Sequence, residues 1–498
     1  MIEVPQTPVG QLSDAWRRCV GAGRFELALR ADYRESLRLA QREIGFQHVR
    51  SHGLLSDGMG VLCEAQGVRR HGFVYLDQVI DTYLELGIRP FLELGFMPSA
   101  LASGDETVFW WRGNITPPRD YGDWADLVQG VLRHLASRYG LAELRRWPIE
   151  VWNEPNLPVF WKDANQQEYF QLYERTATAI KEIDADLLVG GPATSPGAED
   201  WHAPFVELVE SRGLPCDFFS THAYTSGMPQ QIPFGVYQTL RPPQDLLRQF
   251  EAPRKALAGT SLAGLPVHIT EFSTSYCPNN PIHDTAYQAA YLAPILANGG
   301  DLADSFSYWT FCDVFEEQGV PTSVFHGGFG LLGYRQLRKP AYHLYAFMAR
   351  LGPEILARGA DHLVTRCADG RLAILAWQPV GGSDDGGYDA APEHHSIAFD
   401  IELPGVAEVG VWRRSVGEED GNAWTAWREL GRPMNPTARQ SELLVEASAP
   451  RVRHGSVASV AGRVRLELVL NRHEVTLVEL VPVRPDVHQG MADDRLLG

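Results

Sequence analysis

The chain has 498 residues, of which 44% are hydrophobic and 10% aromatic, and its 44 basic and 62 acidic side chains give a formal net charge of −18. This length exceeds what one hydrophobic core supports, so we expect two or three domains, and the apolar fraction excludes a largely disordered chain. The acidic balance disfavours a nucleic-acid or anionic-membrane partner.

Three further features narrow the class of protein. No run of about 18 apolar residues predicts a membrane span. The start, MIEVPQTPVGQL, has neither the basic nor the apolar region of a signal peptide, which predicts a cytoplasmic protein. The six cysteines form no Cys-x-x-Cys pair, so we expect reduced, mostly buried thiols rather than a disulfide framework.

Residues 1–15 look like an extended segment that could add a strand to a later β-domain. Short apolar strands then alternate with amphipathic helices, which is the pattern of βα units around a parallel sheet. The expected strands are residues 24–29, 46–53, 88–94, 147–154, 187–191, 218–224, 266–272 and 305–311, and clear helices cover 32–43, 75–86, 123–139, 166–183 and 339–350. Eight strands in this rhythm predict a (β/α)8 TIM barrel, an α/β fold, over residues 16–350.

The sequence pattern changes at about residue 352. Short strands of alternating polarity replace the helices, at 362–367, 371–378, 395–401, 464–470 and 474–480, with glycine- and aspartate-rich turns between them. This pattern predicts an antiparallel β-sandwich domain over residues 351–485, followed by a flexible tail over 486–498. The sequence contains no internal repeat.

Two glutamates stand where predicted barrel strands end. Glu154 follows an apolar strand in Trp-Asn-Glu-Pro, and Pro155 has no N–H with which to continue the strand ladder. Glu271 lies in Ile-Thr-Glu-Phe, at the end of another apolar strand. Because barrel enzymes keep their chemistry at the carboxyl ends of the strands, we expect the two carboxylates to meet at one mouth, as cleavage of a glycosidic bond requires.

The two carboxyl groups need different protonation states for that reaction. One must protonate the leaving oxygen, and the other must attack the anomeric carbon or activate water. At a separation of about 5 Å, charge on one carboxylate raises the pKa of the other and separates their roles. We assign Glu154 as acid/base and Glu271 as nucleophile, and we expect Asn153 to hydrogen-bond the sugar hydroxyl beside the anomeric carbon. A salt bridge at a strand end is the alternative interpretation of Glu154.

Five motifs in order resemble glycoside hydrolase family 39, a group of retaining β-xylosidases within the (β/α)8 clan. They are Arg50-Ser51-His52-Gly53, Trp152-Asn153-Glu154-Pro155-Asn156 with Phe160-Trp161, Thr221-His222-Ala223-Tyr224, Thr270-Glu271-Phe272-Ser273-Thr274-Ser275-Tyr276, and Tyr308-Trp309-Thr310-Phe311 with Asp313 to Glu317. The likeness covers roughly residues 20–345, and a trailing β-domain is also expected in the family.

The resemblance implies roles for further residues. His52, Asn153, His222, Glu316 and Glu317 are expected to hold the glycone hydroxyls. Phe160, Trp309 and one aromatic of Phe109-Trp110-Trp111, for which we take Trp110, should wall the glycone pocket. Tyr224 or Tyr276 should hydrogen-bond the nucleophile. The structural alternatives are a core histidine for His222, a solvated loop pair for Glu316 and Glu317, and barrel packing for Trp309.

The expected activity is exo-acting β-xylosidase cleavage of xylo-oligosaccharides, with no metal and no organic cofactor. An arabinosidase, glucosidase or α-L-iduronidase remains an alternative within enzymes; an iduronidase would need basic groups at the pocket, where only Lys162 lies nearby. A metal-dependent hydrolase is disfavoured, because His48 and His52, four residues apart on a strand, are too distant to share an ion. The non-enzymatic alternative is a carbohydrate-binding protein. The resemblance implies that tetramers occur in the family, but no sequence motif decides the oligomeric state, which stays open between a monomer and a homotetramer.

Overall fold

The computed structural model describes residues 1–382 and 391–483. Eight parallel strands form a closed barrel in the order β3 (Cys19–Arg24), β4 (His48–His52), β7 (Arg89–Leu94), β10 (Ile149–Val151), β11 (Val189–Thr194), β12 (Phe218–Ala223), β15 (Val267–Phe272) and β16 (Ser305–Tyr308). Each strand pairs in parallel with its neighbours. The predicted TIM barrel is therefore confirmed.

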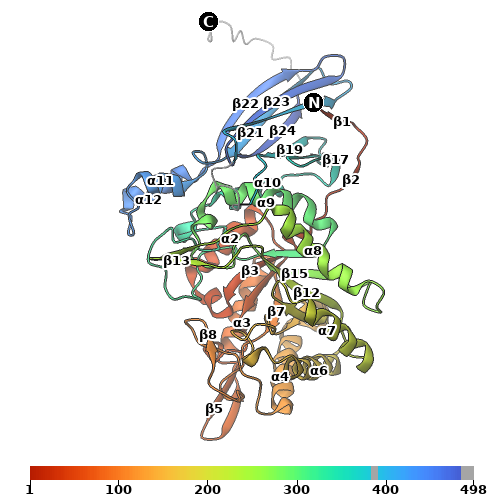
Figure 1. Cartoon of the computed structure of the whole chain (residues 1–498), viewed down its shortest axis with the longest axis vertical. Helices are drawn as coiled ribbons and strands as arrows, with labels where there is room; N and C mark the ends of the chain where they lie inside the picture. The colour runs from red at the N-terminus through yellow and green to blue at the C-terminus, as the bar shows by residue number, and fades with distance from the viewer. Residues whose placement is uncertain (383–390, 484–498) are drawn as a thin grey trace.

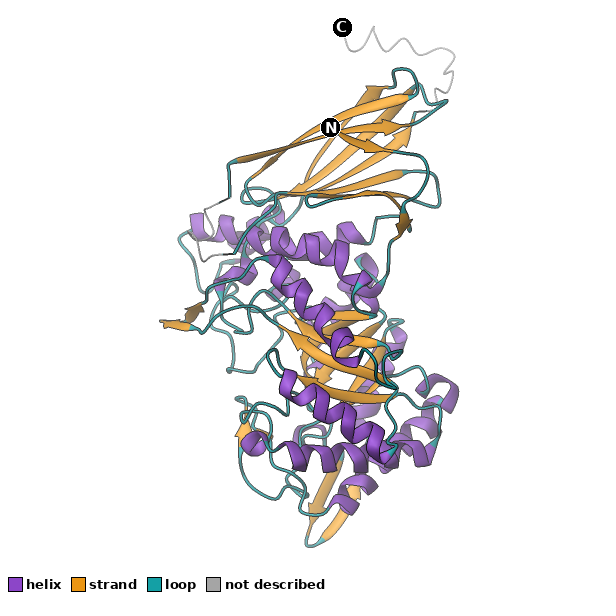
Figure 2. Cartoon of the chain, turned by 45° about the vertical axis from the view of Figure 1, so that its right-hand side comes forward, coloured by secondary structure: helices purple, strands orange, loops and turns teal. Residues whose placement is uncertain are grey.

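Helices cover the outside of the barrel (Figures 1 and 2). They are α2 (Ala31–Glu43), α3 (Val74–Glu85), α4 (Tyr121–Tyr139), α6 (Gln166–Ile183), α7 (Glu199–Arg212), α8 (Pro243–Leu257), α9 (Ala286–Asn298) and α10 (Pro340–Met348). Side-chain caps fix where two of them begin: Asp120 accepts from the N–H groups of Gly122 and Asp123 at α4, and Asn165 accepts from that of Glu168 at α6. Within the described residues, no helix is both long and apolar enough to cross a bilayer.

The first barrel strand was predicted at the wrong residues. Residues 24–29 were expected to form it, but the strand is β3, and Phe25–Leu29 form the short helix η1. The apolar side chains Phe25, Leu27 and Ala28 misled the prediction, since they are buried against the barrel from a helical turn rather than from a strand.

Antiparallel strands follow the barrel and form two sheets (Figure 2). The larger has the order β2 (Gly10–Gln11), β17 (Glu354–Arg358), β18 (His362–Arg366), β19 (Leu372–Trp377), β24 (Val475–Pro482), β21 (Glu408–Val416) and β22 (Arg451–Ala458). The smaller contains β1 (Ile2–Val4), β20 (His394–Glu402) and β23 (Arg463–Asn471). One buried cluster, with Val364 and Val478 from the larger sheet and Phe399 and Leu466 from the smaller, lies between them, as in a β-sandwich.

The leading segment belongs to these sheets, because β1 pairs in parallel with β20 and β2 pairs antiparallel with β17. The expected tail over 486–498 lies outside the described residues. A helical hairpin that the sequence pattern did not reveal, α11 (Ala423–Glu429) and α12 (Ala438–Ala447), lies between β21 and β22. It packs on the loop between β16 and α10, where the ring centroids of Phe325 and Trp427 lie 5.5 Å apart.

Candidate active site

Both predicted carboxylates lie at the carboxyl end of the barrel. Glu271 is within β15, and Glu154 stands in the loop three residues after β10. Their side chains are almost completely buried, and one carboxylate oxygen of each lies in a cluster with a ring nitrogen of His222, in which all three atoms are within 4.8 Å of one another. Carboxyl groups about 5–5.5 Å apart are typical of retaining glycosidases, whereas inverting enzymes separate them by about 6.5–9.5 Å.

The backbone around Glu154 holds the carboxylate in place. Glu154 has a φ of 42°, in a region that residues other than glycine rarely adopt and that costs on the order of 1–3 kcal/mol. The surrounding contacts stabilise it: the N–H of Glu154 donates to the carbonyl of Ala193 at 2.8 Å. Asn156 then exchanges two hydrogen bonds with Ser195, at 2.7 and 2.9 Å, which ties this loop to the loop after β11.

A buried arginine lies beneath the two carboxylates. Arg50 of β4 donates from Nε to Glu150 (2.6 Å) and from Nη1 to Oε1 of Glu271 (2.8 Å). Its Nη2 lies 3.0 Å from Oδ1 of Asn153 and 2.9 Å from Glu93. Because the oxygen of Asn153 is used in this way, its amide N–H groups remain to donate into the cavity. The guanidinium of Arg50 thus holds Glu271 and Asn153 in place from below.

Tyrosine and histidine side chains complete the shell around Glu271 and Glu154. Tyr224 donates to Oε2 of Glu271 at 3.1 Å. Nδ1 of His222 lies 2.8 Å from Oε1 of Glu154, and His52 lies 2.6 Å from Glu93 through Nδ1 and 3.5 Å from Glu271 through Nε2. Of the two tyrosines expected to contact the nucleophile, the structure places Tyr224 there.

Burial and neighbouring charges separate the protonation states. Burial raises the pKa of Glu154 to about 7 and that of Glu317 to about 8, and for Glu317 the carboxylates of Glu271 and Glu154 add to the effect. Burial lowers the pKa of His222 to about 4, so its ring is neutral at pH 7. Burial also opposes the charged form of His52, but the Glu93 carboxylate outweighs it and raises that pKa. Near neutral pH, Glu154 can therefore give up a proton.

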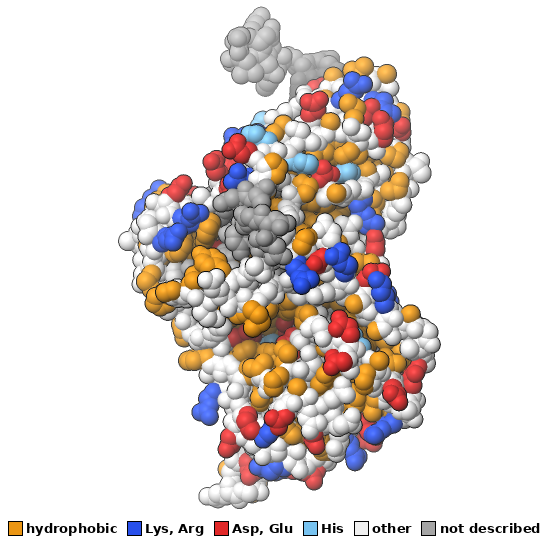
Figure 3. Space-filling model, viewed as in Figure 1, with side chains coloured by type: hydrophobic (Ala, Val, Ile, Leu, Met, Phe, Trp, Pro, Cys, Tyr) orange, Lys and Arg blue, Asp and Glu red, His pale blue; other side chains and the backbone are white. Residues whose placement is uncertain are grey.

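These groups line a cavity of about 470 Å³. Its lining consists of His52, Phe109, Asn153, Glu154, Leu157, Val159, Phe160, Ser195, Pro196, Tyr224, Ser226, Glu271, Tyr276, Trp309, Glu317 and Phe329. On the face of the molecule that Figure 3 shows, recessed acidic side chains lie near the middle and are framed by hydrophobic ones. Elsewhere on this face, Lys and Arg are interspersed with Asp and Glu. Carboxyl groups, a flat aromatic wall and neutral hydrogen-bonding groups suit a neutral sugar.

Most of the expected sugar-binding residues line this cavity: His52, Asn153, Phe160, Tyr224, Tyr276, Trp309 and Glu317. His222 lies just behind it, in contact with Glu154. Tyr276 lines the outer part, with its side chain 40% exposed and its hydroxyl bound to the carbonyl of Gly227.

Two expected residues lie elsewhere. Trp110 is 57% exposed and is not among the described residues that line the cavity; Phe109 takes the place expected for it. The hairpin loop between β8 (Thr107–Val108) and β9 (Gly113–Asn114) turns Phe109 inward and Trp110 outward. Glu316 is held by Arg24 (2.9 Å) and Arg30 (2.6 Å), and it therefore anchors its loop instead of facing the cavity.

The glycosyl hydrolases family 39 model matches residues 1–465 of the chain. The chain belongs to glycosyl hydrolase family 39. It is 45% identical to a β-xylosidase of Geobacillus stearothermophilus over 98% of this chain and 96% of that protein, and 41% identical to a β-xylosidase of Caldicellulosiruptor saccharolyticus over 88% and 89%. A crystal structure of a monomeric β-xylosidase from Caulobacter crescentus CB15 superposes with a TM-score of 0.88 at 31% identity, covering 97% of this chain and 99% of that one. The family resemblance seen in the sequence is thus confirmed.

Sequence reasoning overlooked three charged residues of this family 39 site. Glu93 and Glu150 are fully buried in β7 and β10, and Arg50 was noted only as part of a motif. A charged residue within an otherwise apolar barrel strand is the signal that could have revealed them, because a charge inside a barrel needs a partner. Arg50 forms ion pairs with both Glu93 and Glu150.

The same family 39 cavity contains the donor set for a metal ion. The cluster of Glu154, His222 and Glu271 combines carboxylate oxygens with an imidazole nitrogen, which are ligands that Zn²⁺ accepts. A divalent ion bound there would occupy both carboxylates and so compete with a sugar substrate.

Proposed function

We propose that this family 39 glycoside hydrolase is a retaining β-xylosidase that removes terminal β-D-xylosyl residues from xylo-oligosaccharides. The observation that carries the mechanism is the close pair of Glu154 and Glu271, whose carboxylate oxygens lie within 4.8 Å in different electrostatic surroundings. The full-length identity of 45% to a β-xylosidase supports the substrate class.

The first step forms a glycosyl-enzyme. The carboxylate of Glu271, held by Arg50, attacks the anomeric carbon as Glu154 transfers its proton to the leaving oxygen. The pKa of about 7 at Glu154 matches this role, since the group holds a proton at neutral pH yet releases it readily. The bond from the anomeric carbon to the leaving oxygen breaks, and an ester to Glu271 forms.

The second step reverses these roles. Glu154, now a carboxylate, removes a proton from water, and the oxygen of that water attacks the anomeric carbon from the face that the leaving group vacated. The ester bond to Glu271 breaks, and the sugar is released with its original anomeric configuration. Tyr224, 3.1 Å from Glu271, donates to the carboxylate in the free enzyme and again when it departs.

The remaining cavity groups suit the glycone. The free amide donors of Asn153 can reach the hydroxyl beside the anomeric carbon, where a hydrogen bond strengthens as positive charge develops. His52 and the protonated carboxyl of Glu317 can hold further hydroxyls, and Trp309 and Phe160 offer flat faces to the apolar side of the ring.

The cavity disfavours a uronate, and with it the iduronidase alternative. Among the described residues that line it there is no lysine or arginine, and three are glutamates. Lys162 pairs with Glu106 at 2.6 Å in the long loop after β7 and does not line the cavity. A carboxylate on the sugar would therefore meet repulsion, and the nearest positively charged group of the lining, His52, is already paired with Glu93 at 2.6 Å.

The test is product analysis by NMR with aryl β-xyloside, β-glucoside, α-arabinofuranoside and iduronide substrates, with the anomer read before mutarotation. Initial release of β-xylose, faster than turnover of the other substrates, is expected. Initial α-xylose would mean inversion and would refute the role of Glu271. Preferential cleavage of another glycoside would refute the sugar specificity, and turnover of none would favour the carbohydrate-binding alternative.

A further inference from the structure

The lining of the catalytic cavity includes, besides Glu154, the rings of His52, Phe109 and Trp309. If the proposed function holds, the leaving group lies beside Glu154, and the glycone extends in the opposite direction, towards His52, Trp309 and Phe109. A β-1,4-linked chain would have to continue past these residues for the enzyme to act inside the chain or to release a disaccharide.

A stack of three rings blocks that path. The His52 ring lies over Phe109 with centroids 5.8 Å apart and planes at 27°, and Phe109 lies over Trp111 at 5.4 Å and 28°. Phe109 lines the catalytic cavity and Trp111 lines a second cavity. The two rings Phe109 and Trp111, which we call the aromatic wall, therefore separate two hollows.

Neighbouring backbone holds the aromatic wall in place. A Cβ on Gly53 would lie 3.0 Å from the Trp111 ring, and one on Gly113 would lie 2.9 Å from it, so the ring is seated against two glycines. The N–H of Trp110 donates to the carbonyl of Glu317 at 2.7 Å, which joins the loop after β7 to the loop after β16. This bond fixes the backbone next to Phe109, while the side chain of Trp110 itself is exposed.

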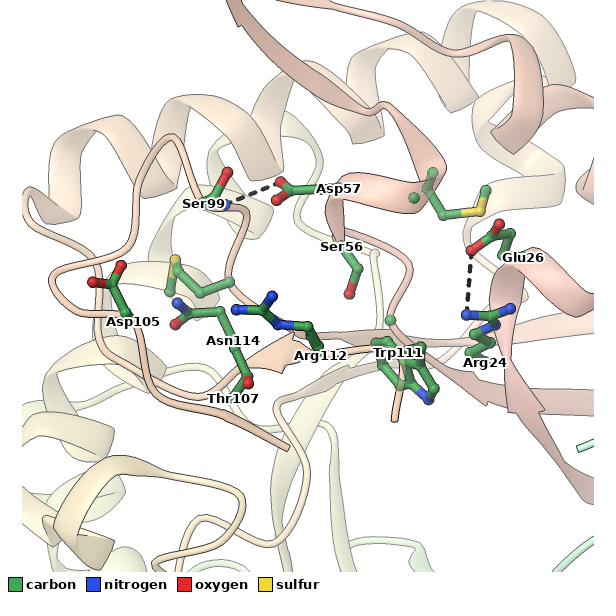
Figure 4. Close-up of a pocket in the computed structure, with 14 residues that line it drawn as sticks. Arg24, Glu26, Ser56, Asp57, Ser99, Asp105, Thr107, Trp111, Arg112 and Asn114 are labelled. Atoms are coloured by element: carbon green, nitrogen blue, oxygen red, sulfur yellow. Dashed lines mark hydrogen bonds and ion pairs between the residues drawn. The ribbon is translucent and has the colours of Figure 1, made fainter. Parts of the chain in front are cut away.

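The second cavity, of about 490 Å³, carries groups that suit sugar hydroxyls. Arg24, Glu26, Ser56, Asp57, Arg112 and Asn114 are among its lining residues, with Trp111 at one edge (Figure 4). Within the described structure, the buried atoms Nε of Arg24 and Oγ of Ser56 have no hydrogen-bond partner. Planar charged groups beside an indole ring are a suitable setting for a neutral sugar ring.

We propose that Phe109 and Trp111 restrict this enzyme to a single glycone residue, and that removing both rings joins the cavities into a site for two. The second cavity would then bind the penultimate xylosyl unit of a chain. The chemistry stays the same hydrolysis at Glu154 and Glu271, but the sugar released becomes a disaccharide.

The wild-type enzyme provides the first test, with an aryl β-xyloside methylated at the 4-hydroxyl, where a β-1,4 chain would continue. We expect kcat/KM to be about 10- to 100-fold lower than for the unsubstituted aryl β-xyloside, because a methyl group forced against a packed wall is disfavoured. Equal turnover of the two substrates would overturn the proposal. Turnover of the unsubstituted substrate separately tests the proposed function.

The second test uses aryl β-xylobioside. The wild type, Phe109→Ala and Trp111→Ala should each release xylose first, because at least one ring of the aromatic wall still closes the path. The Phe109→Ala/Trp111→Ala double variant should instead release xylobiose together with the aryl alcohol. Trp412→Ala, which removes an exposed indole from β21, is the matched control. Xylose alone from a folded double variant would overturn the proposal. If circular dichroism shows that the double variant is unfolded, the single variant Phe109→Ala provides the test. It should turn over the 4-O-methyl substrate faster than the wild type does. If its preference for the unsubstituted over the 4-O-methyl substrate equals that of the wild type, the proposal is overturned.

Discussion

Replacing Glu154 by glutamine should remove a pH-dependent loss of stability. The pKa of this carboxyl is about 7 in the folded protein, against an ordinary value of 4.5, because burial disfavours the charged form. At a pH between these two pKa values, the carboxyl is ionised in the unfolded chain but keeps its proton in the folded protein. The unfolded state then binds fewer protons, so stability falls as the pH rises.

The size of this effect follows from the shift. One pKa unit corresponds to about 1.4 kcal/mol, so the folded protein should lose about 2–3 kcal/mol between pH 5 and pH 8 through this one group. Glu154→Gln cannot ionise and should not show that loss. The variant should therefore gain about 2–3 kcal/mol over the wild type on going from pH 5 to pH 8.

Urea unfolding of both proteins at pH 5, 6, 7 and 8 measures this difference. Glu35→Gln is the control, because Glu35 is exposed on α2 and its carboxylate makes no hydrogen bond or ion pair with any described residue. The stability of this control relative to the wild type should not vary with pH. If the advantage of Glu154→Gln changed by less than about 0.5 kcal/mol over the range, the reasoning on Glu154 would be refuted.

Three further predictions concern the same cavity. In urea unfolding, Arg50→Met should lower stability by about 3–5 kcal/mol, because it leaves the buried carboxylates of Glu93, Glu150 and Glu271 without their cation. Arg89→Met, which breaks a partly buried pair at the other end of the barrel, should cost at most about 1 kcal/mol, and an equal loss in the two variants would contradict the role of Arg50. Tyr224→Phe should lower kcat by about 10- to 100-fold, because one hydrogen bond to a charged group is worth about 1.5–3 kcal/mol, while KM for aryl β-xyloside changes little; an unchanged kcat would count against its contact with Glu271. Zn²⁺ should inhibit competitively with substrate, and its inhibition constant should fall above pH 7, where Glu154 loses its proton. The inhibition should be weaker in His222→Asn. Inhibition that depends neither on pH nor on His222 would place the ion elsewhere.

The barrel was predictable because buried parallel strands and amphipathic helices leave distinct periodicities. Helix α6 was predicted at residues 166–183, where Asn165 caps it and apolar residues recur on one face. The helical hairpin of α11 and α12 escaped prediction because both helices are short and bury little surface of their own. They are stabilised by contact with Phe325, almost 100 residues earlier in the chain, and local patterns carry no such information.

The site was predictable in its chemistry and less so in its contacts. Glu154 and Glu271 could be named because a carboxylate at the end of an apolar strand is unusual. Which ring of Phe109-Trp110-Trp111 faces the cavity depends on a tight loop in which Phe109 has a φ of 62°, and such a loop conformation is not readable from three consecutive aromatics. The diversion of Glu316 to Arg24 and Arg30 likewise depends on loops that meet only in the folded barrel.

Trapping the covalent intermediate tests the central claim most directly. An activated 2-deoxy-2-fluoro-β-xyloside slows both steps but lets the first proceed with its good leaving group, so the glycosyl-enzyme should accumulate. Mass spectrometry of a proteolytic digest should then find one fluoroxylosyl group per chain, attached to Glu271, and none in Glu271→Gln. Attachment at another carboxylate, such as Glu317 or Glu154, would contradict the account.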